Sequence, residues 1–245
     1  MQIKKIVIAT PIAFVNKKEI APGTWSFNFK LLKPLEWQAG QHVILFAKSP
    51  SGKRVRRAFS LSSAPCEPNL TVTTRVNEAP SELKHTLTQL KKGDTLSMRG
   101  PVGRLVLDTN PETEYAFLAT GIGITPFRAI LKNMSENGIT NKVTLFFAGN
   151  KDNHFFREEL SQLNVKMPNL KIKYIYYPDR LMGSTIQELL GDKLLTTTFF
   201  LSGSSKMIKS YRRTLTGLGV GRRNIKSDTF IGFKPRSSHA NVAVK

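Results

Sequence analysis

The sequence predicts two domains of different classes: a six-stranded antiparallel β-barrel at residues 1–108 and a five-stranded parallel α/β domain at residues 109–233. Short apolar or alternating segments, separated by turn residues, fill the first hundred positions. Strands and helices then alternate strictly, which is typical of a parallel sheet. The length of 245 residues and the hydrophobic fraction of 40% suit two small globular domains. Residues 234–245 have the composition of a polar tail.

The barrel strands are expected where apolar segments stand between turn residues such as Pro22, Gly23 and Gly93. The segments that meet this description are Lys5–Ala9, Thr24–Leu31, His42–Ala47, Arg57–Leu61, Leu70–Val76 and Thr95–Arg99. One further segment, Ser81–Leu90, has apolar residues three and four positions apart, and this spacing predicts a helix. Six short strands at such intervals indicate a small Greek-key barrel.

In the second half of the chain, each compact apolar strand is followed by a helix-like segment. The expected strands are Tyr115–Ala119, Val143–Ala148, Leu170–Tyr177, Thr197–Leu201 and Ile225–Phe230. The expected helices are Pro126–Glu136, Phe155–Leu163, Ser184–Leu190 and Ser205–Leu215. Parallel strands joined through helices form right-handed crossovers, so the sequence predicts a Rossmann-like sheet.

The charge balance indicates an acidic or anionic partner, because 37 Lys and Arg face 17 Asp and Glu and the formal net charge is +20. No recognition helix, zinc finger or aromatic sheet motif accompanies this charge, so we expect no nucleic acid partner. The single cysteine excludes an internal disulfide and a four-thiolate iron–sulfur cluster within these residues. No apolar run approaches the roughly 18 residues of a membrane span, so we expect a cytoplasmic protein. The histidines show no metal-ligand spacing, and no metal is expected.

A pair of glycines marks a candidate phosphate-binding turn. Gly121 and Gly123 follow an expected strand, and Pro126 opens the next helix. Glycines at such a turn let backbone N–H groups approach a pyrophosphate, and the helix dipole favours negative charge there. Pro126 stands at a first-turn position, where its missing N–H costs no hydrogen bond. A tight strand-to-helix turn also needs glycine for steric reasons alone, so that interpretation stays open.

The segment from Arg57 to Ser60 is a second candidate site, within an expected barrel strand. Arg57 supplies a fork of donors for a phosphate, Phe59 a ring for stacking on a flat ligand, and Ser60 a hydroxyl. A purely structural interpretation is that Phe59 packs in the barrel core and Arg57 is solvated. Taken alone, the segment favours this structural interpretation.

Together with other segments, these two make nearly the whole chain resemble the ferredoxin-NADP reductase family, in which a flavin-binding barrel precedes a nicotinamide-binding domain. The matching segments, in order, are Gly40-Gln41, Arg57-Ala58-Phe59-Ser60, Thr74-Arg75-Val76, Ala79-Pro80-Ser81, Gly100-Pro101-Val102-Gly103, Thr120 to Pro126, and Gly149-Asn150-Lys151. Phenylalanine replaces the family's tyrosine at position 59, and alanine replaces its commoner glycine at position 79.

The resemblance implies that the barrel binds FAD and that NADPH or NADH is a diffusible substrate of the second domain. The implied FAD-binding residues are Arg57, Ala58, Phe59, Ser60, Thr74, Arg75, Val76, Pro80, Ser81 and Phe233. The implied nucleotide-binding residues are Thr120, Gly121, Gly123, Pro126, Gly149, Asn150, Lys151, Gly203 and Met207. The implied catalytic residues are Ser60, Ser202 and Phe230. Either Phe230 or Phe233 is expected to cover the flavin, with core packing of the last strand as the alternative.

Ser202 departs from the family pattern, because the family has a cysteine beside the reacting carbons. A hydroxyl is smaller and less polarisable than a thiol, so slower hydride transfer is one expectation. The choice of nucleotide depends on cations that follow the strands of the second domain, where a 2′-phosphate binds. Lys151, Arg157 and Arg180 stand at such positions, so NADPH is favoured over NADH.

We therefore expect an oxidoreductase that transfers a hydride between NAD(P)H and FAD and passes electrons to a separate acceptor. The positive charge suits a small acidic carrier such as ferredoxin or flavodoxin. One alternative is the reductase component of a multi-protein oxygenase, which shares the first half-reaction. Another is a non-catalytic basic binding module on the same fold, which leaves the phosphate turns and ring contacts without a physical purpose.

Overall fold

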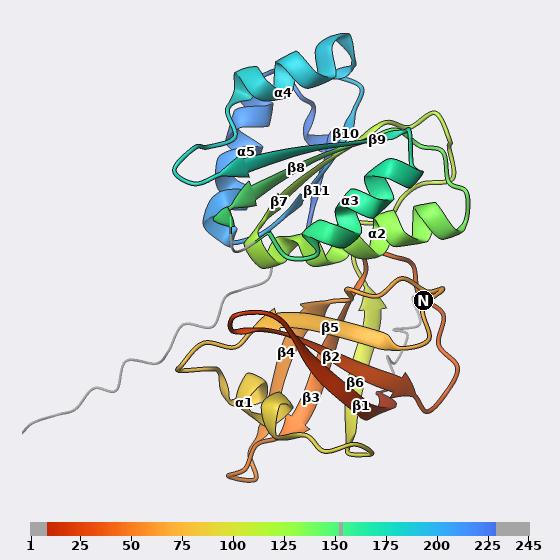
Figure 1. Cartoon of the computed structure of the whole chain (residues 1–245), viewed down its shortest axis with the longest axis vertical. Helices are drawn as coiled ribbons and strands as arrows, with labels where there is room; N and C mark the ends of the chain where they lie inside the picture. The colour runs from red at the N-terminus through yellow and green to blue at the C-terminus, as the bar shows by residue number, and fades with distance from the viewer. Residues whose placement is uncertain (1–8, 152–153, 229–245) are drawn as a thin grey trace, which may run out of the picture.

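Both expected domains are present in the computed structural model, which describes residues 9–151 and 154–228. The antiparallel barrel and the α/β domain lie one on the other (Figure 1). Helix α2 (Thr125–Glu136) runs along the side of the α/β domain that faces the barrel (Figure 1). The fold class predicted from the sequence is confirmed.

Within the described residues, the barrel sheet contains β1 (Thr10–Ala21), β2 (Thr24–Leu31), β3 (His42–Lys48), β4 (Arg54–Ser60), β5 (Leu70–Arg75) and β6 (Thr95–Val102). Its order is β4-β3-β6-β1-β2-β5, and neighbouring strands are antiparallel. A bridge between Leu61 and Val72 joins the two edge strands, so the sheet closes into a barrel. Helix α1 (Glu82–Gln89) buries Leu83 and Leu87 in the barrel core.

The barrel core follows from the period-two alternation of its strands. In β3, Val43, Leu45 and Ala47 are buried, and the residues between them are partly exposed. Phe27 and Phe29 of β2 are fully buried in the same cluster. Burial of each large apolar side chain contributes roughly 1.5–3 kcal/mol, so this cluster is the main source of barrel stability.

Strand β1, at Thr10–Ala21, was not expected from the sequence. The segment Lys5–Ala9 lies outside the described residues except for its last residue, and β1 begins after it. Pro11 lies at the start of β1, where a missing N–H is tolerated. The pairing with β2 is irregular between Phe14 and Asn16, which interrupts the alternation of buried and exposed positions. The exposed polar residues that follow, such as Lys17 and Lys18, therefore show no alternation that would predict a strand.

The described part of the second sheet contains β7 (Tyr115–Thr120), β8 (Val143–Gly149), β9 (Leu170–Tyr176), β10 (Thr198–Ser202) and β11 (Ile225–Ser227), all parallel. Its order is β11-β10-β7-β8-β9. Helices α2 and α3 (Arg157–Lys166) cover one face, and α4 (Gly183–Leu190) and α5 (Ser205–Gly217) cover the other. Short 3-10 helices lie at Gly121–Ile124, Gly191–Lys193 and Arg222–Asn224. The strand order reverses between β7 and β10. In sheets of this kind, ligands bind at the point of reversal, just beyond the carboxyl ends of the strands.

Strand β7 is buried on both faces, as the middle strand of a covered parallel sheet requires. Phe117 stacks on Phe127 of α2 with ring centroids 4.7 Å apart, and on Phe200 of β10 at 5.4 Å. Leu118 points to the opposite face and belongs to the cluster beneath α4 and α5. This two-sided burial explains why β7 is a continuous apolar run.

The barrel and the α/β domain share an apolar contact that we call the domain seam, formed by Ala39, Gly40, Leu105 and Ile130. Ala39 and Leu105 are buried in the same cluster as α2. Gly40 has φ +95°, and a Cβ there would lie 1.9 Å from the Leu105 carbonyl oxygen and 2.8 Å from Ile130 Cδ1. The two backbones approach this closely because residue 40 has no side chain.

The predicted domain boundary, between residues 108 and 109, falls in the connection between β6 and β7. We propose that the two domains meet at this point of the chain. Phe230, Phe233 and the predicted polar tail at 234–245 lie outside the described residues. None of the described helices is both long enough and apolar enough to cross a membrane.

We expect Gly40→Ala to lower the free energy of unfolding by more than about 2 kcal/mol, because it adds left-handed backbone strain and a steric overlap at the domain seam. Gly52→Ala is the matched control, since Gly52 also has a positive φ (+79°) but nothing lies within 4 Å of its missing Cβ. Urea denaturation followed by circular dichroism measures both losses. Equal losses for the two variants would contradict the close approach at residue 40.

Candidate functional site

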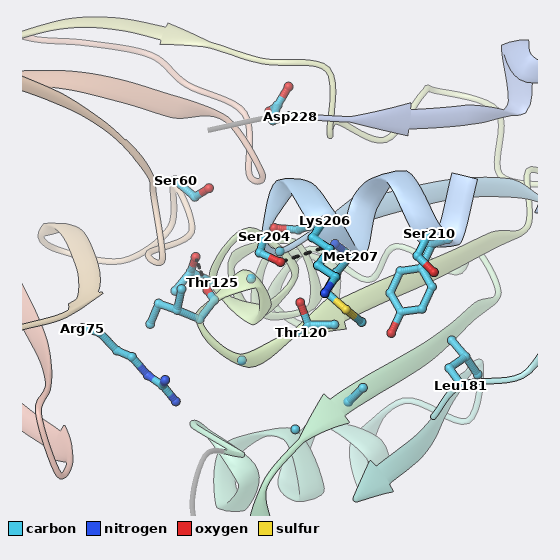
Figure 2. A pocket seen from close by; sticks show the side chains of 18 of the residues that line it. Ser60, Arg75, Thr120, Thr125, Leu181, Ser204, Lys206, Met207, Ser210 and Asp228 are labelled. Atoms are coloured by element: carbon cyan, nitrogen blue, oxygen red, sulfur yellow. Dashed lines mark hydrogen bonds between the residues drawn. The ribbon is translucent and has the colours of Figure 1, made fainter. Parts of the chain in front are cut away.

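A cleft of about 1460 Å³ lies between the two domains, and we call it the interdomain cleft. Residues of β4, β5 and α1 line its barrel side, and residues at the carboxyl ends of β7, β8 and β10 line its α/β side. Figure 2 shows Ser60 and Arg75 on the barrel side and Thr120, Ser204 and Met207 on the α/β side. The cleft therefore lies where the order of the parallel sheet reverses, which is the ligand position that this fold predicts.

A group of basic side chains, the cation cluster, lines the barrel side of the cleft and consists of Arg57, Arg75 and Lys84. Arg57 Nη1 donates a hydrogen bond to Ser81 Oγ at 3.4 Å, and Lys84 Nζ donates to the backbone carbonyl of Arg75. Burial, together with repulsion by Arg57 and Arg75, lowers the pKa of Lys84 to about 8. Burial also lowers the pKa of Arg57. Folding thus holds like charges together, and a bound anion would offset this repulsion.

The donors of the cation cluster fit a diphosphate group. Within residues 9–151 and 154–228, no carboxylate forms an ion pair with a member of the cluster, and Glu82 pairs with Lys53 at 3.8 Å instead. Guanidinium forks and ammonium groups are common donors to phosphate oxygens in proteins. The diphosphate of FAD would supply the negative charge that this side of the cleft lacks.

Phe59 and Ser60 are both buried, at 6% and 8% exposure, and both border the interdomain cleft. Phe59 also belongs to the barrel core cluster. The residue therefore packs in the core and lines the cleft at the same time. Hydroxyl hydrogen bonds of 2.8 Å join Ser62 to Thr73 and Thr73 to Ser26. These bonds tie the segment after Ser60 to β5 and β2, so the Ser60 position is fixed by three strands.

The two glycines of the loop after β7 have different surroundings. This loop is a short 3-10 helix that leads directly into α2. Gly121 has φ +52° and nothing within 4 Å of its missing Cβ, so there is room for a ligand beside it. A Cβ at Gly123 would instead lie 2.3 Å from the Ser202 carbonyl oxygen. The steric interpretation therefore applies to Gly123, and Gly121 is the glycine that leaves space in the cleft.

The loop after β10 packs against the loop after β7. Ser202 ends β10 and is 4% exposed. A Cβ at Gly203 would lie 2.1 Å from Thr120 Oγ1, so the two loops touch there as well. Ser204 caps α5, and its hydroxyl accepts a hydrogen bond from the Met207 N–H at 3.4 Å (Figure 2). The start of α5 is thereby fixed at the wall of the cleft.

The structure brings most of the predicted site residues together. Those that line the cleft are Arg57, Ala58, Phe59, Ser60, Thr74, Arg75, Thr120, Gly121, Gly123, Gly149, Asn150, Ser202, Gly203 and Met207. The described residues that do not line it are Val76, Pro80, Ser81, Pro126 and Lys151.

Val76 packs against the barrel core and Pro126 is buried in the first turn of α2. Lys151 Nζ lies 5.9 Å from the centre of the Tyr176 ring. Pro80 precedes α1 in the loop that ends at its N-cap, Ser81.

Several cleft residues were missed by the sequence analysis. Lys84 follows Ser81 by three positions in α1, so helical spacing was an available signal for it. Asp228 lines the cleft from the end of the last strand, and its carboxylate lies 3.2 Å from His42 Nδ1. The same carboxylate accepts a hydrogen bond from the backbone N–H of Arg104 at 3.2 Å. Nothing in the sequence relates residues 42 and 228.

Two family models match the chain, one for each domain. The oxidoreductase FAD-binding domain matches residues 11–107, and the oxidoreductase NAD-binding domain matches residues 117–213. The first range covers the barrel and the second covers most of the α/β domain.

Curated relatives match across both domains. The stachydrine N-demethylase reductase subunit of Rhizobium meliloti is 23% identical over 236 residues, which are 91% of this chain and 67% of that protein. NADH-cytochrome b5 reductase 1 of Neosartorya fischeri is 29% identical over 224 residues, 83% of this chain and 72% of the relative. The ferredoxin–NAD(P)+ reductase component of the naphthalene 1,2-dioxygenase/salicylate 5-hydroxylase systems of Ralstonia is 24% identical over 212 residues, 83% of this chain and 63% of the relative.

Solved structures share the fold at low sequence identity. Flavohemoglobin from Malassezia yamatoensis superposes with a TM-score of 0.79 at 18% identity, over 92% of this chain and 61% of that chain. Ferredoxin-NADP+ reductase from Plasmodium falciparum superposes with a TM-score of 0.75 at 17% identity, over 90% of this chain and 96% of that chain. The chain thus spans about three fifths of the flavohemoglobin and nearly all of the reductase.

We expect the affinity for FAD to fall as the pH rises through about 8, because Lys84 loses its proton there. Below this pH the ammonium group is charged and attracts the diphosphate, and above it the attraction is lost. Lys84→Met should weaken FAD binding about tenfold at neutral pH and flatten the pH profile. Lys53→Met, at an exposed lysine paired with Glu82, is the control. Fluorescence titration of apoprotein with FAD measures the affinities, and an equally steep profile for both variants would refute the role of Lys84.

We expect Gly121→Ala to weaken NAD(P)H binding about tenfold while FAD stays bound, because the added methyl group occupies the room beside the loop. Gly191→Ala is the matched control. Gly191 has nearly the same φ (+50°) and equally open surroundings, and it does not line the cleft. Equilibrium titration of each variant with NAD(P)H gives the dissociation constants. If both variants bind the nucleotide equally well, Gly121 is not part of the nucleotide site.

Proposed function

Because this chain belongs to the ferredoxin-NADP reductase family and is an NAD(P)H-dependent FAD oxidoreductase, we propose that it transfers electrons from NAD(P)H to a separate carrier protein. The observation that supports this proposal most directly is the construction of the interdomain cleft. The cation cluster on its barrel side and the Gly121–Ile124 loop on its α/β side give two places for a pyrophosphate in one cleft.

On the barrel side, the residues present would hold FAD. Arg57, Arg75 and Lys84 would bind its diphosphate through charge-assisted hydrogen bonds. Bound FAD supplies the redox chemistry, since it accepts a hydride from a reduced nicotinamide and releases electrons singly. Phe59 would contact the flavin with the side of its ring that borders the cleft. The buried hydroxyl of Ser60 would orient the flavin and limit the access of water.

On the α/β side, the loop after β7 would receive the nucleotide. Its position at the start of α2 favours a pyrophosphate, because the unpaired N–H groups and the dipole of a helix attract negative charge at its N-terminus. Ser202 ends β10, its backbone packs against this loop, and the residue lines the cleft. Ser202 would therefore contact the nicotinamide end of the nucleotide. Its main contribution is orientation, since a neutral hydroxyl neither gains nor loses a proton in hydride transfer.

We propose NADPH as the preferred nucleotide, on the basis of cations along the same cleft. Arg180 and Lys206 both line it on the α/β side and are suited to a 2′-phosphate. Arg157 is placed differently, with its guanidinium 5.5 Å from the centre of the Tyr174 ring, and it does not line the cleft. Of the cations considered from the sequence, Arg180 is therefore the one that supports this preference.

We propose a small acidic protein, a ferredoxin or a flavodoxin, as the electron acceptor. The support is the formal net charge of +20, which favours encounter with an acidic partner. A second candidate is the reductase component of an oxygenase system. It is favoured by the similarity to the Ralstonia relative, a ferredoxin–NAD(P)+ reductase component of dioxygenase and hydroxylase systems.

Sequential-mixing stopped-flow absorbance tests the whole proposal. In the first mix, NADPH should bleach the flavin band of the purified protein faster than NADH at equal concentration. In the second mix, an acidic ferredoxin or flavodoxin should restore the band, with a rate that falls as salt is added because charge attraction is screened. Protein without a flavin band, or a band that neither nucleotide bleaches, would refute the oxidoreductase function and favour the basic binding module. Restoration only by an oxygenase component would select the second candidate.

A further inference from the structure

Arg128 connects the two domains and has no part in the function proposed above. It lies in α2, three residues after Thr125, where the helix begins. Its Nη1 donates hydrogen bonds to the Ser62 carbonyl oxygen at 3.0 Å and to Glu67 Oε2. Its Nε and Nη2 donate to the two carboxylate oxygens of Glu159, at 2.9 and 2.5 Å. We call this group, Arg128 with Ser62, Glu67 and Glu159, the Arg128 clasp.

The Arg128 clasp crosses from one domain to the other. Ser62 and Glu67 belong to the barrel segment between β4 and β5, whereas Arg128 and Glu159 belong to α2 and α3. Glu67 is itself fixed, because its Oε2 accepts a hydrogen bond from the Ala64 N–H at 2.6 Å. One guanidinium therefore has a cross-domain arm, to Ser62 and Glu67, and an arm within the α/β domain, to Glu159.

The clasp is partly shielded from solvent and is accompanied by a strained residue. The Arg128 side chain is 14% exposed. Burial alone would lower the pKa of Arg128, but the hydrogen bonds to Glu159 and Glu67 raise it above its ordinary value. The Phe156 ring lies 5.8 Å from the guanidinium, and Phe156 is the one non-glycine residue with a positive φ (+61°) in the described chain. Such strain persists only where the surrounding contacts over-determine the backbone.

The clasp joins residues that lie close in the chain to the two segments that would hold the reacting cofactors. Ser62 follows Ser60 by two residues, and the Ser62 hydroxyl is bonded to Thr73 of β5 at 2.8 Å. Arg128 follows Gly123 by five residues on the continuous path from the 3-10 helix into α2. A shift of α2 against the barrel would therefore change the distance between the Ser60 segment and the nucleotide loop.

We propose that Arg128 is a positioning residue for hydride transfer, and that the cross-domain arm of its clasp sets the spacing between the Ser60 segment and the Gly121–Ile124 loop. The kinetic part rests on the proposed function, whereas the spacing itself is a property of the chain. Displacement of reacting groups by about 1 Å lowers reaction rates by up to about a hundredfold. Loss of the clasp should therefore slow the transfer step and leave the binding of each cofactor unchanged.

Two matched variants separate positioning from mere structural support. Glu67→Ala removes the carboxylate of the cross-domain arm, and Glu159→Ala removes the carboxylate of the arm within the α/β domain. The limiting rate of flavin reduction at saturating NADPH, the nucleotide dissociation constant and the FAD content are measured on the full chain. We expect Glu67→Ala to lower the limiting rate about tenfold and Glu159→Ala to lower it less than about threefold, with both binding quantities unchanged. Arg128→Lys, which keeps the charge but not the fork, should fall between wild type and Arg128→Ala.

Hydrogen–deuterium exchange gives a readout that needs neither cofactor nor turnover. Glu67→Ala should speed amide exchange in both the 61–67 segment and the 121–128 segment, whereas Glu159→Ala should speed it in α3. Equal rate losses for the two glutamate variants, a rate loss explained by weaker nucleotide binding, or unchanged exchange at 121–128 in Glu67→Ala would each overturn the proposal. If the wild-type flavin is not reduced by NADPH or NADH, the proposed function fails, and the exchange comparison still tests the spacing role.

Discussion

The rest of the structure depends on the fixed spacing between the two domains. The two sides of the interdomain cleft come from different domains, so neither domain alone forms the site. At the domain seam, the missing side chain of Gly40 lets its backbone approach both the Leu105 carbonyl and the Ile130 side chain, and this contact limits how far apart the domains lie. Apolar packing has no preferred direction, whereas a guanidinium fork bonds its partners in one plane. The seam and the Arg128 clasp therefore fix different quantities, a separation and an orientation.

Electrostatics prepares the cleft for anions before any ligand binds. Burial lowers the pKa of Lys84, and repulsion by Arg57 and Arg75 lowers it further, because folding places these three groups together with no carboxylate paired to them in the described chain. The donors are therefore already in place, and an entering diphosphate needs little rearrangement of the protein. Arg75 also lies 5.4 Å from the centre of the Phe155 ring, which belongs to the α/β domain. An anion at the cation cluster would thus bind a group that also contacts the opposite domain.

Local patterns in the sequence were sufficient for most of the fold and for part of the site. Alternation predicted β2 over Thr24–Leu31 correctly, because no bulge interrupts its pairing with β5. The pattern of Gly121 and Gly123 predicted a ligand loop, but sequence spacing treats the two glycines alike, and only the packing against Ser202 distinguishes them. The partners of Arg128 lie 61 and 31 positions away, at Glu67 and Glu159. No helix or strand periodicity relates residues at those separations, so the clasp required the tertiary structure.

The pairing of β7 with β10 explains why Ser202, where the family pattern has a cysteine, lies beside the loop after β7. Ala119 and Ser202 are partners in the parallel register, so the two following loops begin at the same level of the sheet. Glycines then allow these loops to touch, at Gly123 against the Ser202 backbone and at Gly203 against Thr120. The position of residue 202 is therefore set by backbone pairing and backbone contact. Oxygen in place of sulfur at this position gives the cleft a smaller and less polarisable side chain.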